Sequence, residues 1–213
     1  MDSSTYISRM ERKGRADYKY YEKYRVSVPT GKSGPWSIEK FTTQMDIAYL
    51  RHCRDGRPPG IGTFTKLLHE DRGIVMSDTV AEMIDVIHFL SALKGHVLVT
   101  GLGLGMVPHI LTKTKEYSKD VKSVTVIEKD RHIIKLVGKF YRDSDPRIKI
   151  ICADAFTWQP PRSMKYDAAW HDIWDCIDDD NRSEMTRMRR HFQRSVKGGK
   201  QFCWGERKQR RGW

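Results

Sequence analysis

The stretch from Gly95 to Asp130 constrains the fold of this chain more than any other, and it reads GHVLVTGLGLGMVPHILTKTKEYSKDVKSVTVIEKD. Its first part, His96 to Thr100, predicts a buried strand because it is a short apolar, β-branched run. The strand breaks into three glycines spaced two apart, Gly101, Gly103 and Gly105. A second β-rich run follows from Ser123 to Ile127. The stretch therefore predicts a strand, a glycine turn, a helix and a second strand in that order.

The residue types at the two strand ends indicate a nucleoside pocket. Glycine lacks a Cβ, so it accepts positive φ and lets backbone N–H groups approach a ligand beside the positive end of the next helix. Glu128 ends the second strand, where a carboxylate can accept two hydrogen bonds from a ribose diol. A glycine turn alone can be a plain connection, but the order of the features favours a pocket. The G-x-G-x-G spacing favours S-adenosylmethionine over NAD, whose enzymes use G-x-G-x-x-G.

Strand and helix patterns alternate regularly after the glycines. This rhythm predicts an α/β fold with a doubly wound, mostly parallel sheet, whose binding site lies at the carboxyl ends of the strands. The expected helices are 106–115, 131–141 and 181–196, and the expected further strands are 122–127, 147–151, 166–170 and 200–204. The chain ends nine residues after Trp204. We therefore expect a sheet that is shortened at its C-terminal edge or filled in by N-terminal strands.

The third strand ends in CADAF, which suits an adenine ring. Asp154 offers an acceptor for the exocyclic amine, and Ala155 and Phe156 offer apolar surface around the ring. The alternative is an acidic turn that leads into the prolines Pro160 and Pro161.

The fourth strand delivers WHDIWD into the same cleft. His171 is a candidate for moving a proton, and Asp172 for binding a substrate amine or the ammonium of a methionine moiety. Trp174 is a candidate wall, and Asp175 follows Asp172 at D-x-x-D spacing. Neither histidines nor acids recur at a metal-ligand spacing, so we expect no metal. The four cysteines are scattered and indicate neither a disulfide framework nor a zinc site.

Residues 1–94 are predicted to form an N-terminal extension and residues 95–213 the α/β core. The first 25 residues form a basic arm with tyrosines at 18, 20, 21 and 24. Such rings can stack on bases, but packing on a neighbouring subunit or on the protein's own core is the favoured interpretation. A helix is expected from Ser37 to Cys53, and a hairpin from Thr63–Leu68 and Ile74–Met76.

A second N-terminal helix is predicted from Ser77 to Lys94, with Ser77 or Thr79 as N-cap. Its buried side is expected to carry Val80, Met83, Ile84, Ile87, His88 and Leu90. His88 is interpreted as a core histidine rather than a ligand. Asp78 and Glu82 lie near the helix start, from where they can reach the mouth of the pocket, although helix-dipole complementarity explains them equally well.

The formal net charge of +12 suggests an anionic partner. Eleven Lys and Arg residues stand against two acids between Arg182 and Trp213. This basic C-terminal segment is either a solvated helix and tail or a contact for nucleic acid. No apolar run approaches the roughly 20 residues that a membrane span needs, and the N-terminus is not signal-like. The expected setting is the reducing cytoplasm.

From about Gly95 to Trp204 the chain resembles the class I S-adenosylmethionine-dependent methyltransferases. VLVTGLGLG looks like their first motif, VTVIEKD like the acid after the second strand, CADAF like the adenine loop, and YDAAWHDIWD like the fourth motif. The whole chain, including GPWSIEKF and RGIVMSDT, is similar to a group of small methyltransferase-like proteins, many of them encoded by phages. The resemblance implies S-adenosylmethionine as cofactor and methyl transfer as activity.

Residue chemistry and this resemblance together assign the site. The expected cofactor-binding residues are Thr100, Gly101, Leu102, Gly103, Gly105, Glu128, Lys129, Asp154, Ala155, Phe156 and Asp172. The expected catalytic residues are His171, Asp172 and Asp175. Many family members carry an acid before or within the glycine motif, whereas this chain has Thr100 and Leu104 there. The partner of the methionine ammonium is therefore open.

Two alternatives to methyl transfer remain. The D-x-x-D spacing of Asp172 and Asp175 is similar to the fourth motif of spermidine synthases, which implies a polyamine aminopropyltransferase, but Cys176 stands where those enzymes usually have proline. The other alternative is a catalytically degenerate protein that holds nucleic acid through its basic C-terminal segment. The methyl acceptor, whether small molecule, protein or nucleic acid, is open. So is the oligomeric state, although an exposed tyrosine-rich arm would suit a homodimer.

Overall fold

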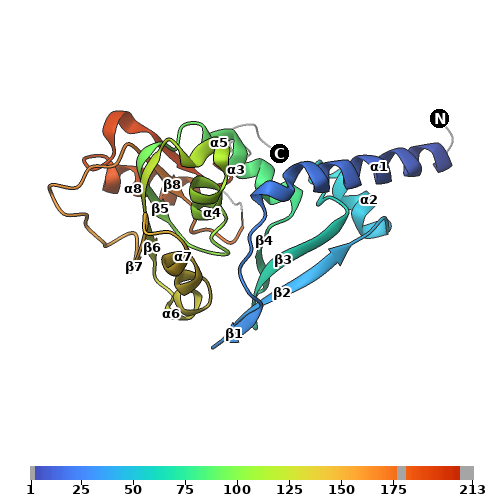
Figure 1. Ribbon diagram of the computed structural model, residues 1–213, viewed down its shortest axis with the longest axis horizontal. Helices are drawn as coiled ribbons and strands as arrows, with labels where there is room; N and C mark the ends of the chain where they lie inside the picture. The colour runs from blue at the N-terminus through green and yellow to red at the C-terminus, as the bar shows by residue number, and fades with distance from the viewer. Residues whose placement is uncertain (1–2, 177–180, 207–213) are drawn as a thin grey trace.

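The computed structural model describes residues 3–176 and 181–206, and its strands form two sheets (Figure 1). The larger sheet has the strand order β7-β6-β5-β8-β9, and each neighbouring pair is parallel. The strands are β5 (Gly95–Thr100), β6 (Val121–Glu128), β7 (Ile148–Cys152), β8 (Ala168–His171) and β9 (Gln201–Cys203). This order confirms the predicted doubly wound α/β fold, with β5 at the centre of the sheet.

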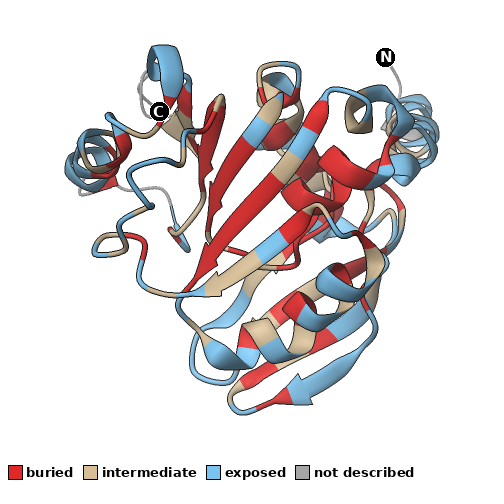
Figure 2. Cartoon of the chain, turned by 60° about the vertical axis from the view of Figure 1, so that its left-hand side comes forward, coloured by how far each residue is buried: buried red, intermediate tan, exposed pale blue. Residues whose placement is uncertain are grey.

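Helices cover both faces of this sheet. They are α3 (Val80–Leu90), α4 (Met106–Lys113), α5 (Lys115–Ser118), α6 (Arg131–Ile133), the π-helix η2 (Ile134–Gly138), α7 (Lys139–Ser144), α8 (Asn181–Phe192) and the 3-10 helix η3 (Lys197–Gly199). Successive side chains of β5 point to opposite faces of the sheet and pack in separate hydrophobic clusters. Val97 packs with Ile110 of α4, and Leu98 packs with Met188 of α8. Figure 2 shows the central strands buried over most of their length, as two-sided coverage requires.

The smaller sheet is antiparallel, with the order β1-β2-β3-β4. Its strands are β1 (Gly31–Ser33), β2 (Trp36–Thr43), β3 (Gly62–His69) and β4 (Gly73–Ser77). The predicted hairpin is confirmed as β3 and β4. The N-terminal strands do not complete the parallel sheet but form this sheet of their own. Within residues 3–176 and 181–206, no further strand pairs with the outer side of β9.

The helix predicted from Ser37 to Cys53 is wrong in its first half. The chain runs as strand β2 to Thr43, and helix α2 (Ile47–Arg54) begins only after Asp46, whose carboxylate accepts the backbone N–H of Tyr49. Helical spacing was present, but β2 pairs along its whole length with β3. Tertiary pairing therefore overrode the local pattern.

The tyrosine-rich arm is helical and packs on the protein's own core. Helix α1 (Ser3–Tyr21) and the 3-10 turn η1 (Glu22–Tyr24) place the Tyr18 ring edge-on to Phe64, with 5.2 Å between ring centroids. Tyr24 is buried, and its hydroxyl donates to the Glu116 carboxylate at 3.0 Å. Tyr20 stays 63% exposed. The favoured interpretation was packing on a neighbouring subunit or on the protein's own core, and packing on the core is confirmed for Tyr18 and Tyr24.

Helix α3 is shorter than the predicted Ser77–Lys94 and has Thr79 at the N-cap position. Its buried side differs from the prediction, because Ile84 and Ile87 are only half-buried and Ala81 is buried. His88 is exposed, and Val86 is buried instead. One hydrophobic cluster joins Ile38 and Phe64 of the N-terminal part to Val97 of the core. The domain boundary at Gly95 therefore stays a prediction.

Candidate functional site

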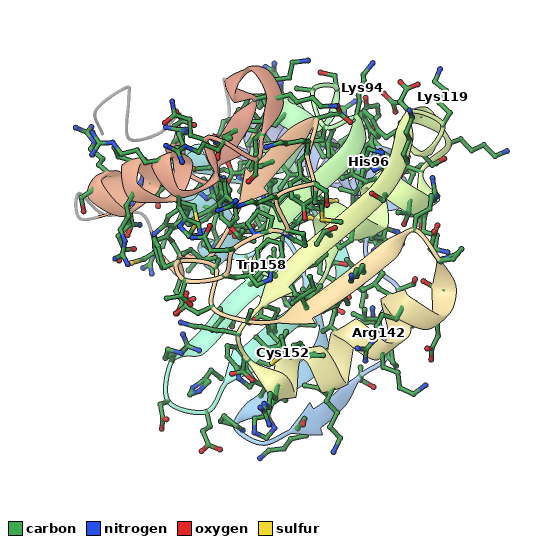
Figure 3. All side chains as sticks on the ribbon, turned by 90° about the vertical axis from the view of Figure 1, so that its left-hand side faces the viewer. Lys94, His96, Lys119, Arg142, Cys152 and Trp158 are labelled. Carbon is green, nitrogen blue, oxygen red and sulfur yellow. The ribbon has the colours of Figure 1, made fainter. Side chains whose placement is uncertain are left out.

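A cavity of about 460 Å³ opens where the parallel strands end and the N-terminal sheet meets them. Figure 3 shows the direction of the strands, with Lys94 and His96 at the amino edge and Cys152 at the carboxyl edge. Of the residues expected in the site, ten line this cavity: Gly101, Leu102, Gly103, Glu128, Lys129, Asp154, Ala155, Phe156, Asp172 and Asp175. Thr100, Gly105 and His171 do not line it.

The three glycines have positive φ, of 86° at Gly101, 50° at Gly103 and 73° at Gly105. Gly101 and Gly105 are also required by neighbouring groups of the protein. A Cβ on Gly101 would lie 1.9 Å from the backbone oxygen of Asp172, and one on Gly105 would lie 2.1 Å from the Tyr141 ring. Gly105 is therefore the turn into α4 and a packing position rather than a contact of the cavity.

Glu128 links the two strand ends. Its carboxylate accepts the backbone N–H of Leu102 and that of Asp130, each at 2.8 Å. The side chain is buried, and burial raises the pKa of its carboxyl group. These hydrogen bonds hold an acid on the wall of the cavity next to the glycine turn.

The CADAF loop forms another wall. The Asp154 carboxylate accepts the backbone N–H of Phe156 at 2.7 Å, which closes a tight turn after β7. Ala155 is buried, and the Arg187 guanidinium of α8 lies 4.5 Å from the centroid of the Phe156 ring. The loop thus presents one acid beside an aromatic ring, as the sequence predicted.

His171 is not placed where it could act in this cavity, which corrects its expected role. The side chain is fully buried between the sheet and α8, stacked on Phe192. One ring nitrogen contacts the Thr100 hydroxyl and the other the Gln201 side chain, both at 3.0 Å. Burial lowers the pKa of His171 to about 4, so the imidazole is a neutral core group. Thr100 belongs to the same internal network.

Asp172 lies one residue further along and on the opposite side of the strand. It lines the cavity and is half-buried. Burial and the neighbouring Glu82 raise the pKa of Asp172 to about 7. Asp175 is exposed and forms an ion pair with Arg72, whose guanidinium lies 4.8 Å from the centroid of the Trp36 ring.

Several lining residues come from the N-terminal part and were missed as site residues. They are Trp36, Leu67, Arg72, Val75 and Met76. The indole N–H of Trp36 donates to the Asp130 carboxylate at 2.7 Å, and this bond ties β2 to the loop after Glu128. These residues are far from the core in the sequence, and no sequence pattern indicated that they line the cavity.

The two acids near the start of α3 separate in the structure. Glu82 lines the cavity, and burial raises its pKa to about 7. Asp78 points elsewhere, because its carboxylate accepts the backbone N–H groups of Val26 and Thr65. Glu82 therefore reaches the cavity, which its place near the helix N-terminus does not by itself explain. Asp78 holds two backbone segments together instead.

Residues 95–189 match the family model of ribosomal RNA adenine dimethylase. The match covers the glycine turn, Glu128, the CADAF loop and Asp172, and it contains strands β5 to β8 of the parallel sheet but not β9. This segment is therefore similar to a family of S-adenosylmethionine-dependent methyltransferases. The matched segment is less than half of the 213 residues, and the N-terminal sheet lies outside it.

Solved structures similar to the parallel-sheet part of the chain were also found. A DhpI–SAM–HEP complex is 20% identical, with a TM-score of 0.39, over 56% of this chain and 50% of that one. Coclaurine N-methyltransferase bound to N-methylheliamine and SAH is 16% identical, with a TM-score of 0.43, over 58% and 34%. The CcbJ methyltransferase from Streptomyces caelestis is 16% identical, with a TM-score of 0.41, over 55% and 46%. This chain thus spans half or less of those proteins. Curated protein sequences gave no match.

No helix within residues 3–176 and 181–206 has the length and apolar character needed to cross a membrane.

Proposed function

We propose that this chain is an S-adenosylmethionine-dependent methyltransferase whose acceptor binds at the junction of the core and the N-terminal sheet. The observation that carries the proposal is the cavity at the strand ends, in which the glycine turn, Glu128 and the CADAF loop meet. The family match over the same segment supports it. A cavity of about 460 Å³ is within the roughly 300–1,000 Å³ common for small-molecule sites.

The residues of the cavity fit this cofactor. Glu128 is held by the Leu102 N–H with its carboxylate on the cavity wall, where it would accept hydrogen bonds from the ribose hydroxyls. Asp154 would accept from the adenine amine, with Ala155 and Phe156 against the ring. The backbone of Gly101 to Gly103 would lie along the methionine part. When bound, the cofactor supplies an electrophilic methyl group.

The protein's task in such a transfer is to align the acceptor with the methyl group and to exclude water. Asp172 lies at the end of β8 in the cavity, and its pKa of about 7 suits it to accept a proton from an acceptor or to hold a positive group. Trp36 and Arg72, from the N-terminal sheet, would cover the bound molecules on the side away from the core.

The experiment that tests the proposal is calorimetric titration of the full chain with S-adenosylmethionine and S-adenosylhomocysteine. We expect micromolar binding, and we expect Glu128→Gln to weaken it at least tenfold because a neutral amide accepts hydrogen bonds less strongly than a carboxylate. Glu39→Gln, a change of the same kind at an exposed residue outside the cavity, serves as the control. A folded wild-type chain that binds neither ligand would refute the proposal.

The proposal does not name the individual methyl acceptor. Aminopropyl transfer remains the second candidate because both Asp172 and Asp175 line the cavity. Incubation with the decarboxylated cofactor and putrescine separates the two reactions by their products. An RNA or DNA acceptor would use the basic side of α8, and its affinity would fall steeply as salt concentration rises.

A further inference from the structure

The glycine turn, residues 101–105, uses most of its backbone N–H groups within the protein. Four of its five N–H groups donate to protein acceptors, and the fifth, that of Gly103, has no partner within residues 3–176 and 181–206. Gly103 lines the cavity. The four acceptors are the backbone oxygens of Ile127 and Leu102, the carboxylate of Glu128 and the sulfur of Met76.

One of these acceptors comes from outside the parallel sheet. The Leu104 N–H donates to Met76 Sδ at 3.3 Å, and Met76 belongs to strand β4 of the small sheet. A Cβ on Gly103 would lie 2.5 Å from the same sulfur atom. The sulfur therefore packs directly on the backbone of the turn. A thioether suits this half-buried place, because it is polarizable and largely apolar yet still accepts a weak hydrogen bond.

A bulge in β4 directs Met76 at the turn. Met76 pairs with Leu67 whereas Ile74 pairs with Leu68, so Val75 is an extra residue in β4. Val75 and Met76 are consecutive, yet both line the cavity. Successive side chains of a regular strand point to opposite faces, whereas a bulge re-aims them. The small sheet thus places a side chain against the glycine turn through a local irregularity of its outer strand.

Glu128 and Met76 anchor the turn on two sides of Gly103. Glu128 accepts the Leu102 N–H from the end of β6, and Met76 accepts the Leu104 N–H from β4. Gly103 lies between these two residues, so both bonds restrict the orientation of its N–H. Glycine allows a wide range of backbone conformations, and a glycine-rich turn needs such anchors to keep one geometry. A turn that is fixed before binding loses less conformational entropy when a ligand binds.

We propose that Met76 is a positioning residue for the amino-acid part of S-adenosylmethionine and acts through the glycine turn. This inference rests on the proposed function, in which the backbone of Gly101 to Gly103 lies along that part of the cofactor. Met76 supplies no reacting group. It holds the Leu104 N–H, and with it the turn, in the geometry that the cofactor needs. The small sheet therefore affects affinity for the amino-acid part, whereas affinity for the adenosine part depends on Glu128 and the CADAF loop.

The test compares a ligand that contains the amino-acid part, S-adenosylhomocysteine, with one that lacks it, 5′-methylthioadenosine. The full chain and its Met76→Leu variant are titrated calorimetrically with both. Leucine keeps an apolar side chain of similar volume but removes the sulfur acceptor. We expect affinity for S-adenosylhomocysteine to fall about fivefold or more, and affinity for methylthioadenosine to stay within about twofold.

Met164→Leu is the matched control. The sulfur of Met164 also accepts a hydrogen bond, from the Tyr166 hydroxyl at 3.0 Å, but Met164 lies outside the cavity. Both affinities should stay unchanged in this variant. Met76→Gln separates the hydrogen bond from packing, because its amide oxygen offers an acceptor on a side chain of similar length. We expect Met76→Gln to bind S-adenosylhomocysteine more tightly than Met76→Leu does.

Hydrogen exchange of the Leu104 amide, followed by NMR without ligand, tests the anchor itself. It should be about fivefold faster in Met76→Leu than in the wild type, since loss of the acceptor favours local opening of the turn. Exchange in Met76→Gln and Met164→Leu should resemble that of the wild type.

A loss that is confined to S-adenosylhomocysteine in Met76→Leu, with recovery in Met76→Gln, would support the inference. Equal losses for both nucleosides would show a general effect on the fold and refute it. It is also refuted if Met76→Leu binds as the wild type does, or if Met76→Gln binds no more tightly than Met76→Leu. A folded wild type that binds neither nucleoside refutes the proposed function, and the role of Met76 with it.

Discussion

Single residues in this protein show how little separates a site residue from a core residue. His171 and Asp172 are adjacent, yet the strand turns one side chain into the packing under α8 and the other into the cavity. Both have shifted pKa values because both are withdrawn from water, downward to about 4 for the histidine and upward to about 7 for the acid. In each case burial favours the neutral form.

Gly101 is the residue whose replacement should be most informative for the strand-end turn. We expect Gly101→Ala to lower the free energy of unfolding by about 3 kcal/mol, since it adds the strain of a positive φ to a clash with the Asp172 backbone. Gly56 also has a positive φ, of 71°, but open space around its Cβ position. Gly56→Ala should therefore cost only about 1 kcal/mol. Urea unfolding of both variants measures the difference, and equal losses would contradict the argument.

At the scale of elements, the N-terminal sheet contributes to the site as directly as the strands of the core. Strand β2 begins with Trp36, whose indole reaches the loop after β6, and the β3–β4 turn brings Arg72 to Asp175. The Ser33 hydroxyl lies 3.1 Å from the His132 ring at the start of α6. Three contacts thus attach the small sheet along the rim of the cavity.

Trp36→Phe tests whether this attachment supports ligand binding. The change keeps an aromatic ring but removes the hydrogen bond to Asp130, worth about 1.5–3 kcal/mol when the acceptor is charged. We expect affinity for S-adenosylhomocysteine, measured by calorimetry, to fall about fivefold or more. Trp158→Phe, at a tryptophan outside the cavity, should leave affinity unchanged. A Trp36→Phe variant that binds as tightly as the wild type would show that the sheet does not support the cavity.

For the whole molecule, burying ionisable acids in the cavity lowers the free energy of unfolding at neutral pH. The folded pKa of Asp172, about 7, lies above its ordinary value of 3.8. The folded state therefore binds the proton more tightly between these values, and the stabilisation from this group is lost as pH rises toward 7. His171 acts in the opposite direction, because its folded pKa of about 4 makes stability fall as pH drops from 6.5.

Asp172→Asn should accordingly stabilise the protein above pH 7, on the order of 2 kcal/mol, since the amide carries no charge to desolvate. The gain should shrink toward zero near pH 4, where the wild-type carboxyl group is protonated in the folded state. Unfolding in urea at pH 8 and pH 4.5 measures both values, with Asp71→Asn as the exposed control. A constant difference between variant and wild type at the two pH values would contradict the raised pKa.

The sequence alone determined the parallel core and most of one side of the cavity. The glycine turn, Glu128 and the CADAF loop follow strands directly, and parallel strands place their carboxyl ends at one edge, so local pattern was sufficient. The same reasoning placed Asp172 in the cavity.

Only the tertiary structure decided the other side. Trp36 and Arg72 come from a separate antiparallel sheet, and no local pattern specifies where such a sheet docks. Strand β2 itself has helix-compatible spacing, and its pairing with β3 made it a strand. Only the folded structure placed Glu82 at the cavity, because a carboxylate near a helix start is equally stable in solvent. Burial and contacts between distant residues are set by packing, and they decided which acids line the cavity.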